Sequence, residues 1–347
     1  MPSAKKNIHT DLKAVDELLA GVGLKHGRRL LMSAGFERQP KHPMQQAKPK
    51  GSRAAVKEAG PAIVQSPLFQ QIPWLLHGFS TRVGGASTAY SSDRHTGELN
   101  LGFTSADTVR NVTANRKTLV RMVAGARRGS APKLLTINQI HSSMTRLVRP
   151  EDAARTLKGD GMMTGEARLL LGIQTADCIP VLVADRRTRA VAAFHAGWRG
   201  TLKRIVEGGI GRMRLEFGSR PEDLIAAIGP GIGQCCYSVG EEVRSEFESQ
   251  FEYASKLFRD VYDSDPIKEK YPLLFLTARA PGHSNIGPSL HLDLVEANRR
   301  QLLDAGVAED AIFVSGECTS CQTGRYFSHR AEHGFTGRMM SVIGVRG

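Results

Sequence analysis

The sequence lacks a long apolar run, an export signal and an even number of cysteines. None of its 347 residues belongs to an uninterrupted apolar stretch of about 18 or more residues, so no membrane-spanning helix is predicted. Residues 1–20 mix Lys, Asp and Glu without a continuous apolar core, which argues against a secretory signal. Five cysteines are an odd number in a long chain and do not fit a disulfide-stapled secreted domain. We therefore expect a cytoplasmic protein with free or metal-bound thiols.

Positive charge is concentrated in the first 60 residues. They hold twelve Lys or Arg against five Asp or Glu, which supplies +7 of the formal net charge of +13. Residues 37–60 have few large apolar side chains and cannot bury enough surface to offset the entropy of ordering. We predict a flexible basic tail over residues 1–60 and a folded domain over residues 61–347. We interpret the tail as a solvated segment that aids solubility. Its positive charge makes it the part of the chain that would contact nucleic acid, if any does.

Beyond residue 60, short apolar runs alternate with stretches of helical periodicity. Compact apolar runs predict buried strands at 169–174, 179–184 and 190–195. Further strands are predicted at 134–140, 145–148, 223–228, 312–315 and 339–345, and helices at 201–217, 239–251 and 294–305. This mixture indicates an α/β fold with a mixed sheet. The proline-rich segment 253–290 is interpreted as a peripheral loop or flap.

Three short polar segments follow apolar strands: residues 138–141, 175–178 and 195–200. They contain His141, Cys178 and His195. Imidazole and thiolate are good zinc ligands, and three protein ligands leave a fourth tetrahedral position for water, as in catalytic zinc sites. The three residues are 37 and 17 positions apart, far from any local zinc motif. Spacing alone therefore leaves open the alternative of hydrogen-bonded structural histidines and a small buried cysteine.

Two arginines and one aspartate are further candidates for the site. Arg82 lies just before a pair of glycines, and Arg199 lies within the 195–200 segment. Arginine beside a glycine-rich loop suits phosphate recognition, and a structural role is the alternative for both. Asp177 precedes Cys178, so it is a candidate general base or a residue that orients a ligand. A turn cap is the plainer interpretation of Asp177.

The remaining cysteines form two short motifs. Cys318 and Cys321 make a single CxxC, which alone is half a zinc site or a redox pair. Cys235 and Cys236 are adjacent, so we expect their side chains to diverge and not to bind one metal together. We interpret all four as ordinary thiols.

The order of several segments resembles a known family. The matching stretches are HGFSTR at 77–82, LNLG at 99–102, NQIH at 138–141, DG at 160–161, TADC at 175–178, HAGWRG at 195–200, CCY at 235–237, LDL at 292–294, CT at 318–319 and TGRMM at 336–340. Together they run from about residue 70 to the C-terminus. The chain resembles the YfiH-type, laccase-domain proteins, which carry an older polyphenol oxidase label and are regarded as purine nucleoside phosphorylases.

The resemblance implies a single-domain α/β fold in which helices flank stacked sheets, in the order α-β-β-α. It implies a zinc ion on His141, Cys178 and His195, with copper as the alternative metal. It also implies phosphorolysis of adenosine, inosine, guanosine and methylthioadenosine, and deamination of adenosine. The basic tail, the length of segment 253–290 and His329, where an aromatic residue is common, depart from the family pattern.

The resemblance further implies a purine nucleoside and phosphate as binding partners. Arg82 and Arg199 are the candidates for binding phosphate, Gln139 for hydrogen-bonding the substrate, and Asp177 for acid–base chemistry. Family members are also linked to editing of cell-wall precursors, so a peptidoglycan-precursor hydrolase is an alternative function.

The residues themselves bear on three further functions. A multicopper oxidase needs about ten histidine ligands in paired motifs. This chain has eleven histidines in all and no His-x-His pair, which argues against that function. A metal-free enzyme would use Cys178 as nucleophile with His141 or His195 as base. A binding protein would act through the basic tail.

Overall fold

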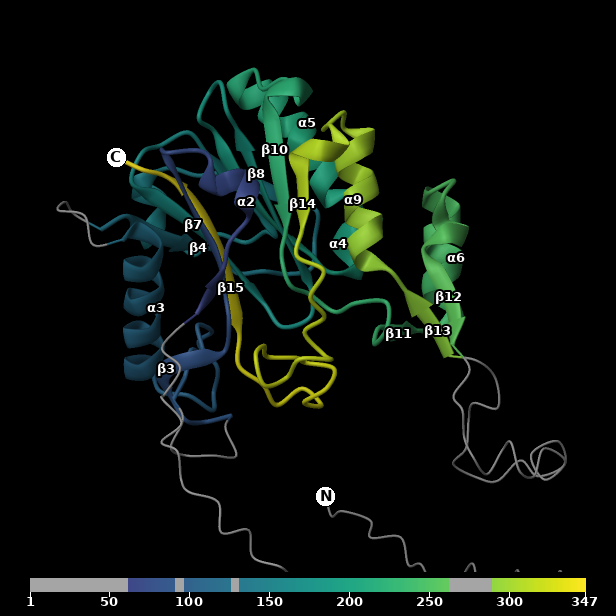
Figure 1. The fold of residues 1–347 in the computed structure, drawn as a ribbon, viewed down its shortest axis with the longest axis horizontal. Helices are drawn as coiled ribbons and strands as arrows, with labels where there is room; N and C mark the ends of the chain where they lie inside the picture. The colour runs from purple at the N-terminus through teal and green to yellow at the C-terminus, as the bar shows by residue number, and fades with distance from the viewer. Residues whose placement is uncertain (1–61, 91–96, 126–130, 262–288) are drawn as a thin grey trace, which may run out of the picture. The chain divides into compact units, whose positions relative to one another are not determined.

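Two mixed sheets form the centre of the fold in the computed structural model (Figure 1), which describes residues 62–90, 97–125, 131–261 and 289–347. The predicted tail, residues 1–60, lies outside the described residues. The first sheet has the strand order β1 (Ile63–Val64), β2 (Leu75–Ser80), β15 (Met339–Val345), β7 (Leu169–Thr175) and β4 (Lys133–Thr136). Its strands are antiparallel except for the parallel pair β4 and β7.

The second sheet runs in the order β14 (Ile312–Val314), β10 (Leu224–Ile228), β8 (Ile179–Asp185), β9 (Val191–Ala196), β6 (Gly161–Thr164) and β5 (Thr145–Leu147). The pairs β10–β14 and β5–β6 are parallel, and the other neighbours are antiparallel. Both sheets are therefore mixed, as the sequence predicts.

Apolar side chains on both faces of the inner strands hold the layers together. On β8, Leu182 and Ala184 pack in a cluster with Leu171 and Ile343 of the other sheet. The alternate residue Val181 packs on the opposite face, toward the helices. Successive side chains of a strand point to opposite faces, so a strand buried on both sides reads as a continuous apolar run.

Helices cover the two outer faces, which gives the predicted α-β-β-α arrangement. Helix α3 (Val109–Ala124) packs Leu119 against β7 and β15 of the first sheet. Helices α5 (Ile205–Phe217), α6 (Glu241–Gln250) and α9 (Leu294–Asp304) contribute to the cluster on the outer face of the second sheet. The short helices are α2 (Pro67–Gln70) and α4 (Trp198–Leu202), and β3 (Val83–Ser87) lies beside α3. No helix among the described residues is long and apolar enough to cross a membrane.

Three local expectations need correction. The single helix predicted over 201–217 is two helices, α4 and α5, because Arg204 between them adopts a left-handed conformation with φ of 56°. The strand predicted over 134–140 ends at Thr136, and the chain then forms a loop. The described ends of segment 253–290 contain regular structure rather than loop alone: a 3-10 helix (Ala254–Lys256) precedes β12 (Phe258–Val261). Strand β12 pairs with β13 (Ser289–Leu292), and β13 pairs with β11 (Ser238–Val239).

A buried histidine on β2 makes stability depend on pH. The Nε2 atom of His77 accepts a hydrogen bond from the backbone N–H of Ser66 at 3.1 Å, and its ring packs edge-on against Phe69. Burial lowers the pKa of His77 to about 4. The folded-state pKa is below the unfolded value, so the unfolded chain gains the proton first as the pH falls. The contribution of neutral His77 to the unfolding free energy is fully present above the unfolded pKa of about 6.5 and is lost as the pH falls toward 4.

We therefore expect wild-type protein to lose about 2 kcal/mol more unfolding free energy than His77→Gln between about pH 7 and pH 5. The glutamine amide oxygen can accept the Ser66 N–H but does not titrate. Urea unfolding at the two pH values measures the difference. Equal pH dependence in the two proteins would contradict the assignment.

Candidate metal centre

Three chain segments bring His141, Cys178 and His195 together. His141 lies in the loop after β4, Cys178 in the turn between β7 and β8, and His195 on β9. Strands β8 and β9 are antiparallel neighbours with Pro180 opposite His195, which places the start of β8 beside the end of β9. The ligand atoms of the three residues lie within 4.8 Å of one another, close enough to hold one metal ion. The Cys178 Sγ atom is 4.0 Å from His141 Nε2.

Gly197 leaves room for this approach. A Cβ atom at this position would lie 3.0 Å from Cys178 Sγ and 3.2 Å from His141 Cδ2. Any other residue would therefore crowd two of the three side chains. This requirement explains the glycine directly after the β9 strand.

A buried carboxylate organises the histidines. Asp160 is fully buried, and its Oδ1 atom lies 2.9 Å from His195 Nδ1. The same carboxylate accepts backbone hydrogen bonds from Ile140, His141 and Ser142, and a further one from the Ser142 hydroxyl. These bonds hold His141 in an uncommon left-handed conformation, with φ of 56°. Asp160 thus orients the imidazole of His195, fixes the backbone that carries His141, and leaves Nε2 of His195 for a metal.

The charged groups at the centre shift one another's pKa values toward the ionised forms. Burial opposes ionisation of Asp160, but hydrogen bonds from His195 and Ser142 lower the pKa of Asp160 to about 2. Burial also disfavours the Cys178 thiolate, yet the charge of His195 and the hydrogen bond from His141 lower the Cys178 pKa below its ordinary value. The same pairing raises the pKa of His195 despite its burial. A thiolate is the form of cysteine that binds metals.

The centre opens into a cavity of about 630 Å³, a size typical of small-molecule sites. Its lining includes three arginines, namely Arg199, Arg330 and Arg338. Asp177 is the one acidic residue in the described lining. The cavity is therefore suited to an anionic group near the candidate metal ligands.

Two predicted residues line the cavity with their polar groups already engaged. Gln139 donates to the Gln174 carbonyl and accepts from the Gln174 N–H, both at 2.8 Å, so its amide extends the β4–β7 pairing. The carboxylate of Asp177 accepts from the Thr319 hydroxyl and the Arg330 backbone N–H, each at 2.7 Å. Asp177 has a φ of 91°, so these bonds also stabilise an uncommon backbone conformation.

The two predicted phosphate-binding arginines lie in different surroundings. Arg199 lines the cavity, with its guanidinium 4.3 Å from the Trp198 ring centre. Arg82 is absent from the described lining. Its guanidinium is largely buried and pairs with Glu98 at 2.5 Å and Glu332 at 2.9 Å. The structure thus gives Arg82 a contact that ties β3 and the segment after it to residues 323–332.

Sequence reasoning gave no role to Asp160, Arg330 and Arg338. Asp160 and Arg338 both lie in segments that match the family, which is the signal that could have singled them out. Arg330 had no such signal. It enters the site because its backbone N–H bonds Asp177, far away in the sequence.

The chain matches the family model described as multi-copper polyphenol oxidoreductase laccase over residues 76–346. It is 32% identical to the purine nucleoside phosphorylase YlmD of Geobacillus stearothermophilus over 80% of this chain and 97% of that relative. It is 35% identical to a purine nucleoside phosphorylase of Deinococcus radiodurans, over 78% of this chain and 88% of that one.

A solved structure shows the same fold. The crystal structure of the hypothetical protein YfiH from Bacillus licheniformis matches with a TM-score of 0.67 and 29% sequence identity, covering 83% of this chain and 97% of that one. The matches in sequence and in structure agree over most of the described residues. The chain therefore belongs to the YfiH-type laccase-domain family, which includes the purine nucleoside phosphorylases just compared.

Proposed function

We propose that this protein is a zinc-dependent purine nucleoside phosphorylase. It uses phosphate to convert adenosine, inosine, guanosine or methylthioadenosine to a free base and a ribose 1-phosphate, and it deaminates adenosine as a side activity. The observation that carries the proposal is the convergence of His141, Cys178 and His195 with three arginines at one cavity. The names of the two curated relatives support the substrate class.

The set of donor atoms favours zinc. Two imidazoles and one thiolate are a catalytic zinc set that leaves one position for water or substrate. Zinc bound there would act as a Lewis acid and lower the pKa of a bound water toward 7. Multicopper oxidation needs further copper sites, and the other potential metal-binding group in the described residues contains cysteines alone. We place the enzyme in the cytoplasm, where thiols stay reduced.

The three arginines are proposed to bind phosphate. Arg199 has no carboxylate partner among the described residues. Arg330 is held by the Ser238 side chain and carbonyl, at 2.7 and 3.0 Å. Arg338 is held by the carbonyls of Thr336 and Gly337. Guanidinium groups fixed in this way bind a phosphate dianion with little further ordering cost.

The other lining residues are proposed to hold the nucleoside. Trp198 and Tyr237 present aromatic surface suited to a purine base. Burial raises the pKa of Tyr237 to about 12, so its hydroxyl keeps its proton and can donate a hydrogen bond. Gln139 and Asp177 act by positioning, because their hydrogen bonds fix the loop before His141 and the turn before Cys178.

The first test combines turnover and metal content. Purified wild-type protein should contain zinc and release adenine from adenosine only when phosphate is added; inosine formed without phosphate would report the deaminase activity. His141→Ala should lose the zinc of this centre and more than about 100-fold of turnover. Chromatography of products and elemental analysis give both readouts.

The matched control is His333→Ala, which changes a histidine outside the described lining and should retain metal and activity. Full turnover by metal-free His141→Ala would contradict the mechanism. Zinc-loaded wild-type protein that leaves purine nucleosides unchanged would overturn the phosphorylase assignment and direct the search to cell-wall precursors.

Asp160 provides a second test. Asp160→Asn keeps the size of the side chain but weakens its hold on His195, so zinc affinity should fall about 10- to 100-fold. Competition with a chelator measures the change. Asp185→Asn is the matched control, because Asp185 is equally buried and accepts backbone hydrogen bonds away from the centre. An equal loss of affinity in both variants would show that general destabilisation is the cause.

Arg199 provides the third test. A charge-assisted hydrogen bond contributes about 1.5–3 kcal/mol, so Arg199→Ala should raise the KM for phosphate about 10- to 100-fold. The KM for adenosine should change much less. Arg110→Ala, at an exposed position on α3, is the control and should leave both values unchanged. An unchanged KM for phosphate in Arg199→Ala would exclude Arg199 from the phosphate site.

A further inference from the structure

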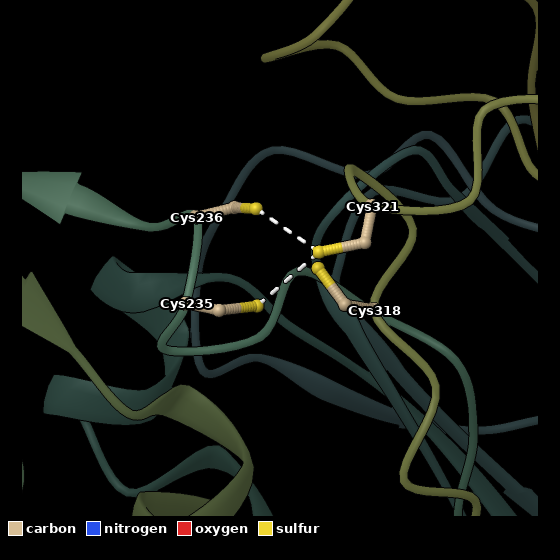
Figure 2. Close-up of side chains that lie close together, drawn as sticks. All are labelled: Cys235, Cys236, Cys318 and Cys321. Carbon is tan, nitrogen blue, oxygen red and sulfur yellow. Dashed lines mark hydrogen bonds between the residues drawn. The ribbon is translucent and has the colours of Figure 1, made fainter.

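Four cysteines from two distant segments form a second cluster. Cys235 and Cys236 lie between β10 and β11, and Cys318 and Cys321 lie after β14. Figure 2 shows the two pairs of side chains pointing toward each other. The Cys321 Sγ atom is 3.4 Å from Cys235 Sγ and 3.3 Å from Cys236 Sγ, and all four sulfurs lie within 4.8 Å of one another.

The expectation that Cys235 and Cys236 diverge was therefore wrong. A turn causes the difference: the N–H groups of Cys236 and Tyr237 both bond the Gly233 carbonyl, at 3.0 and 3.1 Å. The tight turn directs both thiols to one side. The CxxC motif, which the sequence offered as half a zinc site or a redox pair, supplies the other half of the cluster. The sequence did not indicate that the two cysteine pairs meet.

The backbone holds the two segments together independently of the sulfurs. Gly231 pairs with Cys318 in a β-bridge, and the Thr319 N–H donates to the Gly231 carbonyl at 2.9 Å. The Gly233 N–H donates to Cys318 Sγ at 3.2 Å, a contact of the kind that stabilises a thiolate. A Cβ atom on Gly233 would lie 3.2 Å from Cys235 Sγ and 3.5 Å from Cys318 Sγ, so glycine at this position leaves room for the sulfurs.

We propose that Cys235, Cys236, Cys318 and Cys321 bind a second zinc ion, which is structural. Zinc–sulfur bonds of about 2.3 Å in a tetrahedron separate the sulfurs by about 3.8 Å. This separation lies between the 3.3 and 3.4 Å contacts of Cys321 and the 4.8 Å limit that contains all four sulfurs. Binding releases the thiol protons and needs no oxidant. Four protein ligands leave no open position, so this ion takes no part in turnover.

Other occupants fit the geometry less well. A disulfide needs a sulfur–sulfur distance of about 2.05 Å, shorter than the contacts to Cys321. Cys321 also contacts both Cys235 and Cys236, and it could form a disulfide with only one of them. An iron–sulfur cluster spreads its cysteine ligands over more than one iron, which would hold the sulfurs farther apart than a single ion does.

The second ion would fix one wall of the candidate active-site cavity. Cys236 precedes Tyr237, which lines the cavity. Thr319, within the CxxC motif, donates to Asp177 at 2.7 Å. The ion would therefore join the Tyr237 turn to the segment that anchors Asp177. Its binding does not depend on which reaction the cavity catalyses.

Zinc counting in full-length protein tests the proposal. Wild-type protein should carry two zinc ions per chain. The double variant with Cys318→Ser and Cys321→Ser should carry one. Cys178→Ala should lose the other, so failure of either site is seen separately. Ser320→Ala changes the same loop without removing a thiol and should keep both ions.

A second measurement does not depend on folding of the variants at the cluster. Cobalt(II) substituted into Cys178→Ala should give the absorption spectrum of a tetrathiolate site, and the four thiols should react with a thiol reagent only after chelation. Zinc content unchanged by the double serine substitution would overturn the proposal. A disulfide in the cluster, or iron in place of zinc, would overturn it equally.

Discussion

The hydrogen bonding of one buried carboxylate underlies the candidate site. Asp160 binds the ring of His195 on β9 and three successive backbone N–H groups of the loop that carries His141. A buried charge is costly unless it is paired and hydrogen-bonded, so this arrangement resists rearrangement. The His195 ring and the backbone of His141 are thereby held in place by the protein itself. In the proposed zinc enzyme, such preorganisation would reduce the cost of ordering the loop when the metal binds.

The double-sheet core supplies the rigidity that this network needs. Strands β7, β8 and β9 are buried on both faces, and their ends carry Cys178 and His195. Side chains at the ends of packed strands keep their positions better than side chains on free loops. Asp177 and Arg330 lie outside the strands, and hydrogen bonds between distant segments hold them in place.

Arginine serves two purposes in this molecule. Arg82 pairs with the carboxylates of Glu98 and Glu332, and its guanidinium lies over the Phe327 ring. It therefore links segments that are far apart in the chain. Arg199, Arg330 and Arg338 instead line a cavity with one acidic residue. The same residue type is thus found in two different environments, a buried ion-pair network and a cavity wall. A motif that places arginine near a glycine turn carries too little information to separate an anion site from a structural ion pair.

The sequence by itself determined the layered α/β class, the strands β7, β8 and β9, and the residues His141, Cys178 and His195 as a candidate zinc set. Local periodicity and matching segments suffice for these, because the types of residue along the chain indicate which segments are buried and which side chains can bind a metal. Only the tertiary structure decided that Asp160 orients His195, that Arg82 lies outside the described lining, and that two cysteine pairs meet. Those facts depend on which distant segments become neighbours, and contacts between residues far apart in the chain leave no local pattern in one sequence.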